Sequence, residues 1–295
     1  MNILIAGASG LIGTALSLHF KQAGHHVYPL IRGDESHPFS WRPEKQSINL
    51  NPDIALDVVI NLAGPSVADK RWTERRKSEI LQSRIMATTL LSNTLINLDH
   101  PPQLFVSASA IGFYGPRDDS VVDEKTENGT GFLAEVSRQW ETATENAEAA
   151  GIRTVCTRFG IVLSTDGGAL AKMLTPFKLG LGGVIGSGQQ YMSWISLNDV
   201  VGAIDFLLSN KQVSGPINLV SPNPVTNYEF TRTLGKVLSR PTVLPMPTWL
   251  CRLMFGEMAN EILLTGAKVM PTRLTEVGYS FKDANLDQAL SSLLK

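Results

Sequence analysis

The chain has 295 residues, enough for one sizeable α/β domain with an appended lobe. Hydrophobic residues make up 43% and charged residues 18%, which is a globular composition without room for a long disordered tail. The formal net charge of −1 provides no basic footprint for nucleic acid or an anionic membrane, so a small-molecule partner is expected.

Cysteines and histidines give no sign of a metal site. The two cysteines, Cys156 and Cys251, cannot supply a disulfide framework or four thiolate ligands for zinc, and both are expected to be buried and inert. None of the five histidines lies at metal-ligand spacing from a carboxylate, so the sequence predicts no metal.

The N-terminus carries no targeting pattern. It enters an apolar strand at once, without a basic region before a long apolar segment, and no apolar run approaches the roughly 18 residues of a membrane span. The sequence therefore predicts a cytoplasmic protein with no membrane partner.

The first half alternates between strands and helices. Apolar strand patterns cover 2–6, 26–32, 57–63, 103–109 and 153–159, and helical patterns cover 11–24, 73–98 and 131–150. Four of the strand runs are almost continuously apolar, as expected where helices cover both faces of a parallel sheet. The fold class predicted is α/β, a Rossmann-type doubly wound parallel sheet with a smaller C-terminal α/β substrate lobe.

The sequence pattern changes after Gly160. Glycine and proline clusters separate shorter helical patterns at 198–209 and 227–238, the second opened by a possible capping box of Thr226 and Glu229. The predicted division is 1–166 for the nucleotide-binding domain, with parts of the later chain returning to it. Residues 167–295 form the substrate lobe, which includes a C-terminal segment at 247–295.

A glycine-rich turn links the first strand to the first helix. The run GASGLIG places Gly7 at a tight turn, Gly10 where backbone must approach a pyrophosphate, and Gly13 where helix and strand pack closely. The spacing is GxxGxxG, and its position between an apolar strand and an amphipathic helix favours a dinucleotide site over an ordinary turn.

The end of the second strand selects between nicotinamide cofactors. An NAD site usually carries an acidic residue there, about 20 residues past the glycines, to bond the ribose. Here the strand ends in Arg32, whose guanidinium can clamp a 2′-phosphate, so NADP(H) is favoured. NAD(H) is the alternative, because Asp34 and Glu35 follow closely and could serve a ribose instead.

Several motifs together resemble a known family. GASGLIG, NLAG and SASAIGFYG are similar to the extended short-chain dehydrogenase/reductase superfamily, which includes sugar-nucleotide epimerases. RWTERRKSEILQSRI, FLAEVSRQWE, TRFGIVLS and GSGQQYMSWISLNDV resemble, more narrowly, an epimerase-like subfamily in which a short C-terminal domain follows the NAD-dependent epimerase/dehydratase domain. The resemblance covers essentially the whole chain. The expected cofactor-binding residues are Gly7, Ser9, Gly10, Leu11, Ile12, Gly13, Arg32, Leu62, Ala63, Gly64, Ser107, Ala108, Gly160 and Ile161.

The resemblance also implies a catalytic serine with a Tyr and a Lys four residues apart, and only the serine has a match. It is Ser109. The residues four positions after the five tyrosines are Arg, Asp, Ile, Arg and Asp, so the chain contains no YxxxK. The matching helix positions are Leu133 and Ser137, which cannot exchange a proton usefully.

Three side chains are candidate replacements for the missing proton donor. They are Tyr114, which could instead be a packed aromatic, Glu135, which could face solvent, and Tyr191, which belongs to a run expected to enter the substrate pocket. The same run includes Gln189, Gln190, Ser193 and Trp194 and leads to Asp199. Another segment, Lys70 to Trp72, could meet an anionic substrate group or only begin the long helix.

Two functions fit this pattern. The first is an NADP(H)-dependent oxidoreductase or epimerase-like enzyme that acts on a small hydroxylated or nucleotide-sugar substrate with a nonstandard proton donor. The second is an NADP(H)-binding sensor or interaction protein with little or no turnover. The long helices that flank the predicted sheet could pair in a homodimer, as in many relatives.

Overall fold

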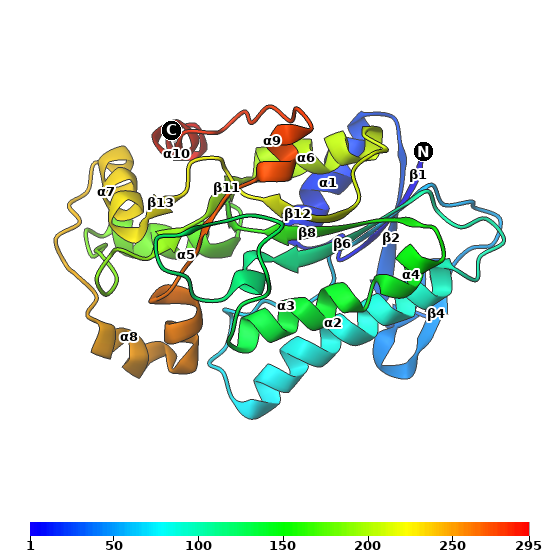
Figure 1. Cartoon of the computed structure of the whole chain (residues 1–295), viewed down its shortest axis with the longest axis horizontal. Coiled ribbons are helices and arrows are strands. Elements are labelled where there is room, and N and C mark those ends of the chain that lie inside the picture. The colour runs from blue at the N-terminus through cyan, green and yellow to red at the C-terminus, as the bar shows by residue number, and fades with distance from the viewer. Residues whose placement is uncertain (295) are drawn as a thin grey trace.

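The computed structural model describes residues 1–294 and is built around a central sheet of eight strands (Figure 1). The strand order is β12-β8-β6-β5-β1-β2-β3-β4, and every neighbouring pair is parallel except β3 and β4. The chain leaves β1 toward β2 on one side and later toward β5 on the other, which creates a crevice at the carboxyl end of β1. The strands are β1 (Asn2–Ala6), β2 (His26–Arg32), β3 (Ser40–Arg42), β4 (Ser47–Asn49), β5 (Val58–Asn61), β6 (Leu104–Ala110), β8 (Arg153–Phe159) and β12 (Gly215–Leu219).

Helices cover both faces of this sheet (Figure 1). Helices α1 (Leu11–Gln22), α6 (Leu197–Ser209) and α9 (Thr272–Glu276) pack on one face, where Leu16 and Ile204 are fully buried. Helices α2 (Glu74–Leu95), α3 (Phe132–Thr142) and α4 (Glu145–Ala149) lie on the other. Because helices cover both faces of the sheet, its strands are apolar on both sides, and the predicted fold class is confirmed.

A second lobe lies beside the sheet (Figure 1). Its core joins helices α5 (Gly168–Lys178), α7 (Asn227–Leu238) and α10 (Leu286–Leu294) around Trp194 and Phe230. Short strands complete it: β9 (Ile161–Leu163), β10 (Tyr191–Met192), β11 (Trp194–Ser196) and β13 (Val225–Thr226). Helix α8 (Thr248–Phe255) and a π-helical turn at Ala259–Leu263 follow.

The C-terminal segment contacts both parts of the chain. Helix α10 packs against α7 of the second lobe. Strand β14 (Lys268–Val269), however, pairs in parallel with β7 (Val121–Val122) of the first half. Strand β12 and helix α6 likewise return to the central sheet from beyond residue 166.

The sequence-predicted elements are present, some with shifted ends, but one predicted helix is divided and one pair of strands was not predicted. Strands 2–6, 26–32 and 153–159 and helix 227–238 have the predicted ends, and Thr226 and Glu229 form the predicted capping box. The single helix predicted at 131–150 is wrong, because it divides between α3 and α4 at the buried Thr144, whose hydroxyl donates to the Glu141 carbonyl. The antiparallel pair β3–β4 was not predicted from sequence, since each strand has only three residues.

Among residues 1–294, no helix is both long enough and apolar enough to span a lipid bilayer. Both cysteines are buried and free, and burial raises the pKa of the Cys156 thiol to about 12.

Candidate functional site

The glycine turn after β1 has the geometry its sequence requires. Gly7 adopts φ +81°, and a Cβ there would lie 2.9 Å from the Leu62 carbonyl carbon. A Cβ on Gly13 would overlap the Gly7 carbonyl oxygen, whereas one on Gly10 would lie 3.4 Å from that atom. Gly7 and Gly13 are therefore needed by the fold itself, and Gly10 leaves free space in front of the turn.

Helix α1 opens toward that space. Gly10 is its N-cap, and no side chain among residues 1–294 caps the first turn, so N–H groups at the positive end of the helix dipole stay free for an anion. Leu11 and Ile12 form the first turn behind it. This is the arrangement that binds phosphate groups at helix N-termini.

A cavity of about 1110 Å³ lies in front of the turn. Five of the expected cofactor residues line it: Gly7, Ser9, Arg32, Ala63 and Gly64. The lining also includes residues of helix α2, namely Glu79, Gln82, Ser83 and Met86, and of the segment after β2, namely Trp41, Pro43 and Glu44. These wall residues were not predicted, because nothing in their local pattern marks a ligand.

Arg32 stands at the cavity in an ion pair. Its Nη2 lies 3.0 Å from Glu44 Oε2, and both side chains are well exposed. A second guanidinium, that of Arg42, lies on the neighbouring strand, pairs with Glu35 at 3.1 Å and donates to the Gly33 carbonyl. The end of β2 thus carries two cations, of which only Arg32 was predicted.

The remaining expected cofactor residues lie on neighbouring strands. Ser107 and Ala108 are buried in β6, and Gly160 and Ile161 follow β8. Gly160 packs on the Ser193 carbonyl, which also accepts a hydrogen bond from the Ile161 N–H at 2.9 Å. The carboxyl ends of β6 and β8 therefore lie on the β5 side of β1, although these residues do not line the cavity.

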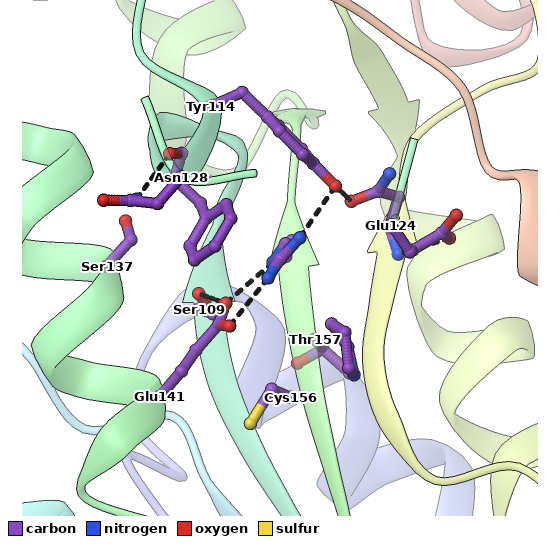
Figure 2. A network of polar contacts seen from close by, with 12 residues as sticks. Ser109, Tyr114, Glu124, Asn128, Ser137, Glu141, Cys156 and Thr157 are labelled. Carbon is purple, nitrogen blue, oxygen red and sulfur yellow. Dashed lines mark hydrogen bonds and ion pairs between the residues drawn. The ribbon is translucent and has the colours of Figure 1, made fainter. Parts of the chain in front are cut away.

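Ser109 belongs to a buried polar network (Figure 2). Its hydroxyl donates to Glu141 Oε1 at 2.6 Å, and the residue is 2% exposed. Glu141 also accepts from Arg158 Nε and Nη2, each at 2.8 Å. In this structure the Ser109 proton is committed to Glu141 and not to a ligand, which sequence reasoning did not foresee.

The network continues to Tyr114 (Figure 2). Arg158 Nη1 donates to the Tyr114 hydroxyl at 2.9 Å, which donates in turn to Asn218 Oδ1 at 2.7 Å. Tyr114 is fully buried, and burial raises its pKa to about 12. The prediction that Tyr114 donates a proton to a substrate is therefore wrong. The ring is a packed aromatic without access to a substrate, and the raised pKa of its hydroxyl opposes proton release.

Helix α3 carries the positions of the missing Tyr and Lys. Ser137 donates only to the Leu133 carbonyl, at 2.9 Å, so it takes over no ionic role. Glu135 faces solvent and holds Arg138 and Gln139. These surface contacts do not fit a proton donor in a cleft, so the prediction that Glu135 replaces the missing proton donor is also wrong.

Tyr191 has a different setting. It lies half-buried on β10, and Lys268 Nζ of β14 stands 5.3 Å from the centre of its ring. Its close neighbour Ser193 contacts Gly160 and Ile161. Of the three candidates, Tyr191 alone combines partial exposure with a neighbouring cation and a link to the end of β8.

The other residues considered from sequence are mostly structural. Trp72 is 7% exposed and donates to the Val67 carbonyl, and Arg71 packs against Gly256. Trp194 is fully buried in the second lobe. Asp199 is buried and accepts from the Lys282 and Asp283 N–H groups, so it anchors the C-terminal segment.

Two family models match this chain. Residues 3–219 match the model described as "NAD dependent epimerase/dehydratase family". The chain belongs to that family. Residues 246–293 match a second model, "Domain of unknown function (DUF1731)", which agrees with the expected short C-terminal domain.

Relatives of similar length support this membership. An epimerase family protein of Mycobacterium bovis is 42% identical over 290 residues, covering 98% of this chain and 96% of the relative. Epimerase family protein SDR39U1 of Mus musculus is 36% identical over 299 residues, with both chains fully covered.

Two solved structures extend the comparison. Human epimerase family protein SDR39U1, crystallised with NADPH, matches with a TM-score of 0.90, 32% identity and 99% coverage of both chains. UDP-glucose 4-epimerase from Thermotoga maritima matches with a TM-score of 0.76 at 17% identity, covering 99% and 97% of the chains, and shares the fold alone.

Proposed function

We propose that this protein binds NADP(H) in the cavity in front of the glycine turn. The observation that carries the proposal is Arg32, a guanidinium at the rim of that cavity where NAD sites usually place an acid. The uncapped α1 N-terminus suits the pyrophosphate, and Arg32 suits a 2′-phosphate. The similarity to a human relative crystallised with NADPH supports the same choice.

We further propose that the bound nucleotide serves an oxidoreductase or epimerase-like reaction on a small hydroxylated substrate, such as a nucleotide sugar. NADP(H) would supply hydride transfer at its nicotinamide. The protein would orient the nucleotide through the ends of β6 and β8, and Tyr191 would hold or release the proton. Lys268 Nζ, 5.3 Å from the centre of the Tyr191 ring, places a charged neighbour beside this half-buried tyrosine and supports the assignment.

A second function is favoured by the Ser109 contacts. The Ser109 hydroxyl is bonded to Glu141, and no Tyr-Lys pair exists to act with it. A protein that senses NADP(H), with little or no turnover, would keep the nucleotide cavity and lack the relay in this way.

One pair of measurements tests these proposals. Fluorescence titration of the wild type with NADPH and NADH should show tighter NADPH binding, and failure to bind either nucleotide would overturn the proposed function. Hydride transfer should then be followed through the absorbance of the reduced nicotinamide with carbonyl compounds and nucleotide sugars, using wild type, Y191F and K268M. Turnover that Y191F abolishes without changing NADPH affinity supports the enzyme; tight NADPH binding without turnover on any substrate supports the sensor.

A further inference from the structure

Two buried arginines of helix α2 stand behind one wall of the nucleotide cavity. Arg84 Nη2 donates to the Pro65 carbonyl at 2.9 Å, and Arg76 Nη2 donates to the Ser66 carbonyl. Both arginines are 8% exposed. Gly64 and Pro65 of the same loop line the cavity, so the Arg84 guanidinium lies directly behind this wall, and Arg76 holds the next residue of the loop.

The pair carries more positive charge than its surroundings neutralise. Within residues 1–294, Arg84 has no carboxylate in ion-pair contact, and its two hydrogen bonds go to the backbone carbonyls of Ile80 and Pro65. Arg76 pairs with Glu79 at 2.8 Å, but Glu79 is 55% exposed, and the buried Arg76 Nε has no hydrogen-bond partner in the described chain. Burial and the charge of Arg76 lower the pKa of Arg84 to about 10, which still leaves Arg84 protonated at neutral pH.

Arg84 fills the space between the loop and helix α3. A Cβ on Gly64 would lie 3.2 Å from its Cζ, and the guanidinium stands 4.9 Å from the centre of the Trp140 ring. Trp140 is three residues after Ser137, the position of the missing lysine, and therefore on the same side of α3. A fixed cation from helix α2 thus packs on the side of α3 that carries that position.

A structural clamp alone does not need this charge. Backbone carbonyls accept hydrogen bonds from neutral donors as well as from guanidinium groups, and a buried charge without a counter-ion is costly. A negative ligand in the cavity would offset that cost. We propose that Arg84 and Arg76 form a buried cationic support, which acts through the loop at Gly64 to Ser66 and stabilises the pyrophosphate of a bound dinucleotide.

This inference rests on the proposed nucleotide binding. It predicts a different effect on the affinities for NADPH and NADH from the effect predicted for Arg32. NADPH and NADH share the pyrophosphate and differ in the 2′-phosphate, so loss of the support should weaken both nucleotides equally. We expect R84Q to raise the Kd of each by about tenfold, the effect of one charge at short range in a protein. R84K, which keeps the charge, should stay within about threefold of wild type.

The matched control is R75Q, which removes the same charge from an exposed position of the same helix. It should change neither Kd. Urea unfolding without nucleotide shows whether each variant folds, and R76Q, judged by the same two titrations, replaces R84Q if R84Q does not fold.

The outcomes separate the two proposals. Equal losses in R84K and R84Q, or wild-type affinity in R84Q, would overturn the cationic support, because clamping and not charge would then explain the arginines. A change in the NADPH to NADH preference of R84Q would also contradict it. If the wild type binds neither nucleotide, the proposed function itself fails.

Discussion

Arg158 and Glu141 meet in a two-point ion pair, with Nε 2.8 Å from Oε1 and Nη2 2.8 Å from Oε2. The Arg158 side chain is 4% exposed and that of Glu141 is 15% exposed. Since Arg158 belongs to β8 and Glu141 to α3, the pair fixes the helix against the sheet at the level of Ser109. Arg158 also lies 3.5 Å from the centre of the Phe113 ring.

Replacing Glu141 should therefore be costly. E141Q leaves the buried Arg158 guanidinium without its counter-charge, so the free energy of unfolding should fall by about 3 kcal/mol. Urea unfolding at pH 7 measures this change. E135Q breaks an exposed ion pair on the same helix and should cost less than about 1 kcal/mol, so equal losses in the two variants would contradict the assignment.

Two glycines of the turn have different roles, because Gly13 is needed for folding and Gly10 for nucleotide binding. G13A forces a Cβ into the Gly7 carbonyl oxygen and should lower the free energy of unfolding by about 2 kcal/mol or more. G10A meets no such obstacle and should leave unfolding nearly unchanged, while its methyl group blocks the pyrophosphate and weakens NADPH by at least about tenfold. Unfolding curves and NADPH titration of both variants check this, and wild-type NADPH affinity in G10A would count against the cavity as the nucleotide site.

Arg32 and Glu44 should set the cofactor preference in opposite directions. R32D should weaken NADPH by about tenfold or more and affect NADH less, because it removes the 2′-phosphate clamp. E44Q releases Arg32 from its exposed ion pair and should tighten NADPH by about threefold, with no change for NADH. The readout is the ratio of the two Kd values, and a ratio that R32D leaves unchanged would refute the clamp.

Glu124 should make stability depend on pH. It is 7% exposed and accepts from the Asn218 and Arg273 N–H groups, and burial raises its pKa above the usual value of 4.5. The folded state then favours the protonated acid, so its stabilising contribution is complete below pH 4.5 and is lost as the pH rises through the raised pKa. The unfolding free energy of wild type relative to E124Q should therefore be higher at pH 4.5 than at pH 7.5; the opposite trend would exclude a raised pKa.

Periodicity predicted the framework of this protein because its long strands and helices each bury a continuous apolar face. That is why β1, β2, β8 and α7 have the predicted ends. It could not predict contacts that depend on distant pairing. Ser109 and Glu141 are 32 residues apart, and Tyr114 and Asn218 are 104 apart, so no local pattern reports that these side chains are already engaged.

The same reason applies to the nucleotide site. The glycine turn and Arg32 follow directly from their places at strand ends, and both line the cavity. Glu44 became a neighbour of Arg32 only through the unpredicted β3–β4 pair. Arg84 sits within a helix of ordinary polar pattern, and only its burial against the Pro65 loop distinguishes it from the exposed Arg75.

The return of α6 and β12 to the central sheet affects how the protein can assemble during synthesis. When a ribosome has released residues 1–166, helix α1 is in place on one face of the sheet, but the part of that face that α6 later covers is still uncovered, and β8 has an open edge. The sheet is completed only after the first part of the second lobe has emerged. An expressed fragment that ends before Leu219 should therefore aggregate, and the nucleotide-binding half cannot be excised as a simple N-terminal piece.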